Sequence, residues 1–186
     1  LNAGSNLIAV MLGNGWYKGR YGLQDFPNKP KPYGEKFALI CELHITLENG
    51  KQMVLGTDTS WKAMPAPVLE SGIYDGETYD ARLPKPTLGK GKFSCVRKIN
   101  LDVSKLQARR SLPVRVNEEI KPKAVIQTPA GETVLDMGQN ITGWIRFKTS
   151  APSGTKIHLQ FGEVLQDGNF YRDNLRTAKA EYIYFA

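Results

Sequence analysis

The chain has 186 residues, 41% of them hydrophobic and 23% charged, which is ordinary for globular proteins and excludes a wholly disordered or collagen-like chain. It carries 25 Lys and Arg against 18 Asp and Glu, a net charge of +7 that would suit nucleic acid or an anionic surface. The longest apolar run, residues 7–12, is far shorter than the ~18 residues of a membrane span, and two cysteines are too few for a disulfide-stapled miniprotein.

Both ends of the sequence have the composition of a folded interior. The run Leu7 to Leu12 comes at once after the first residues and predicts a strand that is buried. The last residues, Tyr182 to Ala186, are aromatic and β-branched and have no turn or cap after them. Natural domain boundaries usually fall in polar, Pro- or Gly-rich linkers, so we expect the chain to be a piece of a longer polypeptide.

Strand patterns dominate the sequence. Apolar residues occupy the odd positions from Phe37 to Leu47, which predicts a half-buried antiparallel strand. The turn Glu48 to Lys51 contains Asn-Gly, which supplies positive φ, and Gln52 to Thr57 is predicted to return as the second strand of a hairpin. Further alternating stretches predict strands at 93–103, 133–137, 143–148 and 156–164.

Helix signals are weak by comparison. Residues 102–110 and 175–180 would each allow a turn or two, without a sustained apolar stripe between caps. The Pro- and Lys-containing segments 27–33 and 83–92 predict surface loops, because Pro lacks the donor that a central strand needs. The sequence therefore predicts an all-β fold, an antiparallel, jelly-roll-like β-sandwich over residues 1–112 and a second, partial β-sandwich over residues 113–186.

The segment from Gly13 to Arg20 places two aromatic residues in a polar, glycine-rich context after an apolar run. The simpler interpretation is a turn in which Trp16 closes one end of the core. The functional interpretation is a sugar site, because aromatic faces stack on the apolar side of a pyranose while Asn14 and Arg20 bind its hydroxyls. We find no phosphate-binding loop here, because no helix is predicted to follow the glycines.

A second candidate is the acidic segment from Gly72 to Arg82. Asp75, Glu77 and Asp80 place three carboxylates around a glycine, and hard oxygen ligands on a turn suit Ca²⁺. The spacing is not that of an EF-hand. The simpler interpretation is an ion pair between Asp80 and Arg82 together with turn hydrogen bonds from Asp75.

Catalysis by this chain is not predicted from its titratable residues. Hydrolysis of a glycosidic bond needs two carboxyl groups about 5 to 9.5 Å apart, one with a raised pKa, and no pattern places any two carboxyls in a common cleft. The two histidines, His44 and His158, fall on the solvent sides of strands without a nucleophile-elbow motif. The candidate acids are Asp75, Glu77, Asp80, Glu163 and Asp167.

The remaining features favour ordinary structural roles. Cys41 and Cys95 fall on the apolar sides of their strands and are expected to be buried thiols, with a disulfide as the alternative in an oxidising compartment. The basic residues are scattered over loops and the expected linker instead of gathering with aromatics on one face. We therefore expect neither a nucleic-acid partner nor a membrane partner.

Six motifs together give a specific resemblance that covers nearly the whole chain. The motifs are residues 13–20, Gly56 to Lys62, Tyr74 to Arg82, Val116 to Pro122, Asp136 to Trp144, and Glu163 to Ala180. In this order, they resemble the N-terminal β-sandwich module and the following concanavalin-like sandwich of bacterial α-L-rhamnosidases, glycoside hydrolase family 78.

The resemblance implies a parent enzyme that hydrolyses terminal α-L-rhamnose by inversion, in a bacterial periplasmic or secreted setting. Its acid and base would lie in a later (α/α)₆ barrel, so this piece is expected to have no catalytic residue and no activity alone. In related enzymes an N-terminal sandwich can bind rhamnose with calcium. By resemblance, Asn14, Trp16, Arg20 and Trp61 would contact carbohydrate, and Asp75 and Glu77 would hold Ca²⁺. The alternative is a purely structural module that packs on the barrel.

Overall fold

The computed structural model describes residues 1–2, 4–19, 33–85 and 91–186. Strands account for 29% of the described residues and helices for 6%, which confirms the all-β class. The strands are β1 (Glu42–Thr46), β2 (Gln52–Gly56), β3 (Lys62–Ala63), β4 (Val68–Gly72), β5 (Gly76–Asp80), β6 (Ser94–Cys95), β7 (Ala124–Gln127), β8 (Thr133–Asp136), β9 (Lys156–Gln160), β10 (Val164–Gln166), β11 (Asn169–Tyr171) and β12 (Glu181–Phe185); the helical turns are α1 (Gly15–Lys18), η1 (Val103–Lys105) and η2 (Asp173–Leu175).

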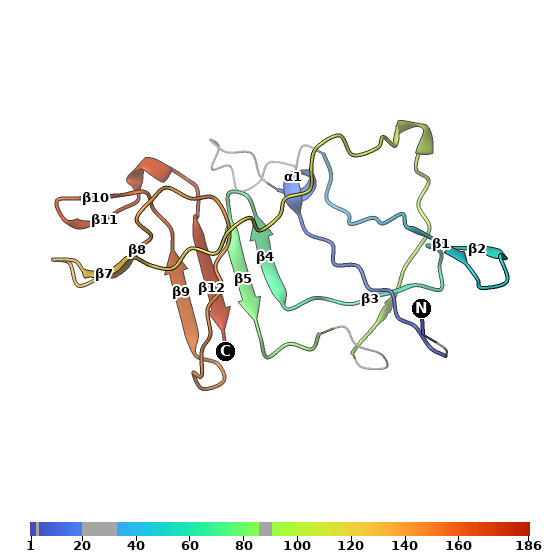
Figure 1. Ribbon diagram of the computed structural model, residues 1–186, viewed down its shortest axis with the longest axis horizontal. Coiled ribbons are helices and arrows are strands. Elements are labelled where there is room, and N and C mark those ends of the chain that lie inside the picture. Colours follow the sequence, from blue (N-terminus) through green and yellow to red (C-terminus); the bar gives the residue numbers. More distant parts are fainter. Residues whose placement is uncertain (3, 20–32, 86–90) are drawn as a thin grey trace.

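The strands form one four-stranded sheet and four two-stranded sheets in the described part of the chain (Figure 1). The large sheet has the order β4-β5-β12-β9, and its pairs are antiparallel except β5–β12, which is parallel. Glu77 pairs with Tyr182 and Tyr79 with Tyr184 in that parallel ladder. The sheet therefore joins strands from both sides of the expected boundary at residues 112 and 113.

The predicted hairpin after residue 47 is present. β1 and β2 pair in antiparallel register, with Leu43 opposite Leu55 and Ile45 opposite Met53. The turn is closed by hydrogen bonds from the Leu47 amide to the Lys51 carbonyl (2.9 Å) and from the Gly50 amide to the Leu47 carbonyl (2.8 Å). Gly50 has φ +79°, the conformation that Asn-Gly turns require.

Several expected strands are shorter or absent. Residues 7–12 form no strand and are exposed, so the prediction of a buried first strand was wrong. Residues 143–148 form no strand, and the stretches at 93–103 and 37–47 keep only β6 and β1. Apolar alternation indicates a face that can pack, but a strand also needs a hydrogen-bonding neighbour, and the described residues supply none at these places.

Large hydrophobic side chains are exposed along much of the described chain. No hydrophobic side chain among the described residues is buried, and the chain exposes 15603 Å². The best-covered part is the large sheet, where Asp80 is 7% exposed and β12 is half-buried along its whole length. In the described ranges, no helix is long and apolar enough to cross a membrane.

Candidate functional site

The acidic segment folds as the hairpin between β4 and β5. Its turn runs from Gly72 to Gly76 and is closed by a hydrogen bond from the Asp75 amide to the Gly72 carbonyl (3.3 Å). Gly76 has φ +67°, and a Cβ there would lie 2.3 Å from the Glu181 carbonyl oxygen. Only glycine permits this approach of the hairpin to the start of β12. Of the three expected acids, Asp75 lies in the turn, whereas Glu77 and Asp80 belong to β5.

Two of the expected carbohydrate-binding residues lie against this hairpin. The Asn14 Nδ2 donates a hydrogen bond to the Ser71 carbonyl (2.6 Å). The Trp16 ring meets the Tyr74 ring edge to face, with centroids 6.4 Å apart, and Trp16 is 51% exposed. Asn14 directly precedes α1 and Trp16 belongs to it; α1 is a single helical turn that was not predicted from the sequence.

The other expected residues are not brought to the hairpin. Arg20 lies outside the described residues. Trp61 is half-buried and directly precedes β3, which pairs with β6 in a separate two-stranded sheet.

Cys41 is half-buried and Cys95 is exposed, and both are free thiols, so the expectation of buried cysteines was wrong. β6 is only two residues long, and that short strand leaves Cys95 uncovered.

A groove of about 480 Å³ borders the hairpin and contains residues that the sequence analysis did not select as candidates. The Trp144 side chain lines it and is 65% exposed, with Phe161 (40% exposed) as a second aromatic wall. The remaining lining residues are Ser71, Gly72, Ile73, Gly76, Glu77, Gly143, Ile145, Lys179, Ala180, Glu181 and Tyr182. The signal in the sequence was a glycine followed by a tryptophan at the start of the expected strand 143–148, and a glycine also directly precedes Trp16.

Charged side chains of both signs line the same groove. Glu181 pairs with His158 across β12 and β9, with 2.9 Å between Oε2 and Nε2. The hydrogen bond from His158 lowers the pKa of Glu181, although partial burial opposes this shift. Burial, helped by the charge of Glu77, raises the pKa of Tyr182. The groove therefore combines exposed aromatic rings, carboxylate acceptors and an ammonium donor, a chemistry that suits a polyhydroxylated ligand.

Calcium at Asp75 and Glu77 stays a prediction. Across the residues the structure describes, no three His, Cys, Asp or Glu side chains gather closely enough to hold a metal ion. Two carboxylates supply fewer than the six to eight oxygens that Ca²⁺ takes. The side chains present do not form a complete site, so we derive no step through a metal ion.

The ion pair expected between Asp80 and Arg82 is confirmed. The Asp80 carboxylate accepts hydrogen bonds from the Arg82 amide (3.0 Å), Nε (2.8 Å) and Nη2 (2.7 Å). These bonds lower the pKa of Asp80, and desolvation opposes them. The pair anchors the end of β5, where the Asp80 amide also donates to the Pro67 carbonyl (2.8 Å).

This pair predicts acid lability of the sheet. A carboxyl whose pKa is lower in the folded state stabilises folding above its unfolded pKa of about 3.9, and this contribution is lost as the pH falls through the folded pKa. Urea unfolding at pH 7 and pH 3 should show a smaller loss of stability on acidification for Asp80→Asn than for the parent, with the variant already weaker at pH 7. An unchanged pH dependence would contradict the assignment.

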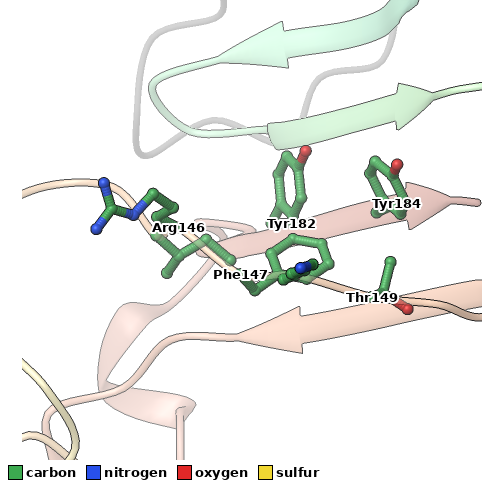
Figure 2. A pocket seen from close by; sticks show the side chains of 7 residues that line it. Arg146, Phe147, Thr149, Tyr182 and Tyr184 are labelled. Atoms are coloured by element: carbon green, nitrogen blue, oxygen red, sulfur yellow. The ribbon is translucent and has the colours of Figure 1, made fainter.

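A second groove, of about 410 Å³, lies on the aromatic face of the large sheet. Figure 2 shows Tyr182 and Tyr184 rising side by side from β12, with Phe147 from the neighbouring segment beneath them. The Phe147 ring meets Tyr184 edge to face with centroids 5.4 Å apart, and Tyr184 stacks on Tyr79 at 5.7 Å. The rings contact one another, so this groove is first of all a packing surface.

Comparison with known proteins decides the family. Residues 1–118 match the family model described as the α-L-rhamnosidase N-terminal domain, and residues 126–186 match the bacterial α-L-rhamnosidase concanavalin-like domain. The chain belongs to the α-L-rhamnosidase family. The family expected from the six motifs is thereby confirmed, and the two matched regions are the ones that share the β4-β5-β12-β9 sheet.

Individual relatives agree with this assignment. An α-L-rhamnosidase of Streptomyces avermitilis is 33% identical over 97% of this chain, and one of Formosa agariphila is 31% identical over all of it. The crystal structure of an Aspergillus terreus α-L-rhamnosidase superposes with a TM-score of 0.85 at 32% identity, over 94% of this chain. The S. avermitilis enzyme, solved in complex with L-rhamnose, superposes with a TM-score of 0.79 over 92%.

The relatives are much longer than the chain. It spans 18% and 20% of the two sequence relatives, and 20% and 17% of the two solved chains. One structural relative comes from a fungus, so the family is not confined to bacteria.

Proposed function

We propose that residues 1–186 form a non-catalytic part of an α-L-rhamnosidase that serves as scaffold and binds rhamnose-containing carbohydrate in the groove beside the β4–β5 hairpin. The parent protein would hydrolyse terminal α-L-rhamnose from glycosides or polysaccharides. An (α/α)₆ barrel in the same polypeptide would carry the catalytic acid and base. The observation that carries the binding role is the exposed Trp144 ring in a groove that also holds Glu77 and Lys179.

Each component of this groove matches a part of a sugar. The Trp144 and Phe161 rings offer apolar faces for the C–H side of a pyranose, and the carboxylates and Lys179 offer acceptors and donors for its hydroxyls. Gly72, Gly76 and Gly143 leave the walls without side chains, so a ring can approach the backbone closely. The relative solved with L-rhamnose suggests rhamnose as the first sugar to test.

The proposal that this part is non-catalytic rests on its carboxyl groups. Glu77 and Glu181 both line the groove, and a glycosidase uses two carboxyl groups that flank the bond it cleaves. A general acid requires a raised pKa, however, and hydrogen bonding lowers the pKa of Glu181. The pKa values of Asp58, Asp80 and Glu132 are lowered as well.

For the segment from Gly13 to Gly19, the contacts favour the alternative, a purely structural role. Asn14 uses its side-chain amide to hold the Ser71 carbonyl, so this residue fixes the hairpin instead of facing a ligand. Trp16 packs its ring on Tyr74 in the same place. We therefore propose that the Gly13 to Gly19 segment supports the hairpin and that the sugar contacts come from Trp144.

Calorimetry with L-rhamnose tests the binding role. Trp144→Ala removes the exposed ring and should weaken binding at least about fivefold, the effect of losing about 1 kcal/mol at an aromatic anchor. Trp61→Ala is the matched control and should leave affinity unchanged, because Trp61 precedes β3 of another sheet and does not line the groove. Repeating the titrations with Ca²⁺ and with EDTA reports whether a calcium ion, held by Asp75 and Glu77, is needed for sugar binding.

Two results would contradict this proposal. Absence of heat above buffer with L-rhamnose would leave the structural alternative. Turnover of p-nitrophenyl α-L-rhamnoside by this chain, lost in Glu77→Gln or Glu181→Gln, would show that the groove is catalytic.

A further inference from the structure

The chain contains two Asn-Gly pairs, Asn14-Gly15 and Asn49-Gly50. In such a pair the backbone nitrogen of the glycine can attack the side-chain carbonyl carbon of the asparagine, because glycine has no Cβ to block the approach. This reaction is one reason why asparagine counts among the thermolabile residues. In sequence the two pairs are equal candidates for it, but the structure gives them different surroundings.

Asn14 is held away from the reacting geometry. It has helical backbone angles (φ −62°, ψ −44°) at the start of α1, where the Lys18 amide donates to its carbonyl (3.0 Å). A helical side chain points back toward the N-terminus, away from the next backbone nitrogen. The Nδ2 that would leave as ammonia donates to the Ser71 carbonyl (2.6 Å) in a partly buried hydrogen bond. Reaction at Asn14 therefore requires both α1 and the contact with Ser71 to open.

Asn49 lies at the exposed tip of the β1–β2 hairpin, where residues 47–51 are all exposed. Its Oδ1 accepts a hydrogen bond from the Lys51 amide (3.0 Å), which polarises the carbonyl under attack and stabilises the oxyanion that develops there. The Gly50 amide donates to the Leu47 carbonyl (2.8 Å), and this bond must open before the nitrogen reacts. It belongs to the turn of a two-stranded sheet, an element that is marginal in water and opens locally at low cost.

We infer that Asn49 deamidates spontaneously in the folded protein, that this change loosens the β1–β2 hairpin, and that Asn14 is protected. The Gly50 nitrogen loses its proton to a solvent base and bonds to the Asn49 Cγ, the Cγ–Nδ2 bond breaks, and ammonia leaves. Solvent water then opens the five-membered succinimide at one of its two carbonyl carbons, which leaves an aspartate or an isoaspartate at position 49. The reaction needs water as its co-reactant and involves no oxidation or reduction.

The loosening follows from the geometry of the turn. An isoaspartate lengthens the backbone of the loop by one carbon atom, and loop length decides how the two strands of a hairpin pair. The hydrogen bond from the Leu47 amide to the Lys51 carbonyl (2.9 Å), which closes the turn, should then be lost. β4 and β5 belong to another sheet and should be unaffected.

Peptide mass spectrometry on the 186-residue chain tests the inference without a sugar. The chain is incubated at mildly alkaline pH, folded and in urea, and deamidation is followed in the peptides that contain Asn14 and Asn49. The rate in urea divided by the rate in the folded chain gives the protection of each pair, which removes the effect of flanking sequence. We expect the protection of Asn14 to exceed that of Asn49 at least about tenfold, the factor that about 1.4 kcal/mol of barrier supplies.

Asn49→Gln is the matched control, because its longer side chain would have to close a six-membered ring. Deamidation at position 49 should disappear in this variant, while Asn14 keeps its rate. After incubation, the amides of β1 and β2 should exchange faster in the parent than in Asn49→Gln, and those of β4 and β5 equally in both. A smaller difference in protection, or equal exchange of β1 and β2 in the two incubated proteins, would overturn the inference. Rhamnose binding can succeed or fail independently of each outcome.

Discussion

Replacing Ile183 by Pro should unfold the large sheet, including the strands contributed by the first half of the chain. Ile183 lies in the middle of β12, which pairs with β5 on one side and with β9 on the other. Proline removes an amide donor and clashes with the ladder, and within a central strand it is not tolerated. We expect a loss of about 3 kcal/mol or more, which accelerates amide exchange in β4 and β5 about 100-fold.

The control for this prediction is Val114→Pro. Val114 lies outside every strand and is 81% exposed, so the same substitution there should change exchange in the sheet very little. If β4 and β5 kept their protection in Ile183→Pro, the two family regions would fold independently, and the parallel pairing would be incidental to stability.

Truncation of Tyr184 should produce the second-largest effect. Its ring stacks on Tyr79 at 5.7 Å and meets Phe147 edge to face at 5.4 Å, so it joins β5, β12 and the segment after Trp144. Tyr184→Ala removes these two ring contacts, the stacking of Tyr184 with Tyr182 at 6.4 Å, and part of the buried area of a half-buried residue, which we expect to cost about 2 kcal/mol. Urea unfolding followed by near-ultraviolet circular dichroism measures the shift.

Tyr184→Phe separates ring packing from the hydroxyl. It keeps all three aromatic contacts and should stay within about 0.5 kcal/mol of the parent. An equal loss in the two variants would mean that the hydroxyl, and not the stacked rings, holds this face together.

Local sequence signals predicted local structure well. The Asn49-Gly50 turn and its flanking alternation predicted the β1–β2 hairpin, because the turn conformation and the strand period are set by neighbours along the chain. The ion pair of Asp80 with Arg82 was also predictable, because the two residues are two positions apart at the end of one strand. The family could be recognised because its six motifs keep their order.

Long-range pairing could not be predicted in this way. No periodicity indicates that β5 lies beside β12, because parallel neighbours share no turn. The run Leu7 to Leu12 has the composition of a buried strand, yet burial depends on a neighbour that the pattern does not specify. Trp144 was missed as a binding candidate for the same reason, because its groove is assembled from the β4–β5 hairpin and three distant segments.

The β5–β12 ladder also affects how the protein folds while it is being synthesised on the ribosome. Its two strands are about 100 residues apart, so at about 5 to 20 residues per second β5 waits roughly 5 to 20 s for β12 to be translated. During that delay β5 presents an open edge, and edges of this kind recruit other chains. Folding of the first region is therefore expected to need chaperone protection until the second emerges, and premature termination between them should yield an aggregating product.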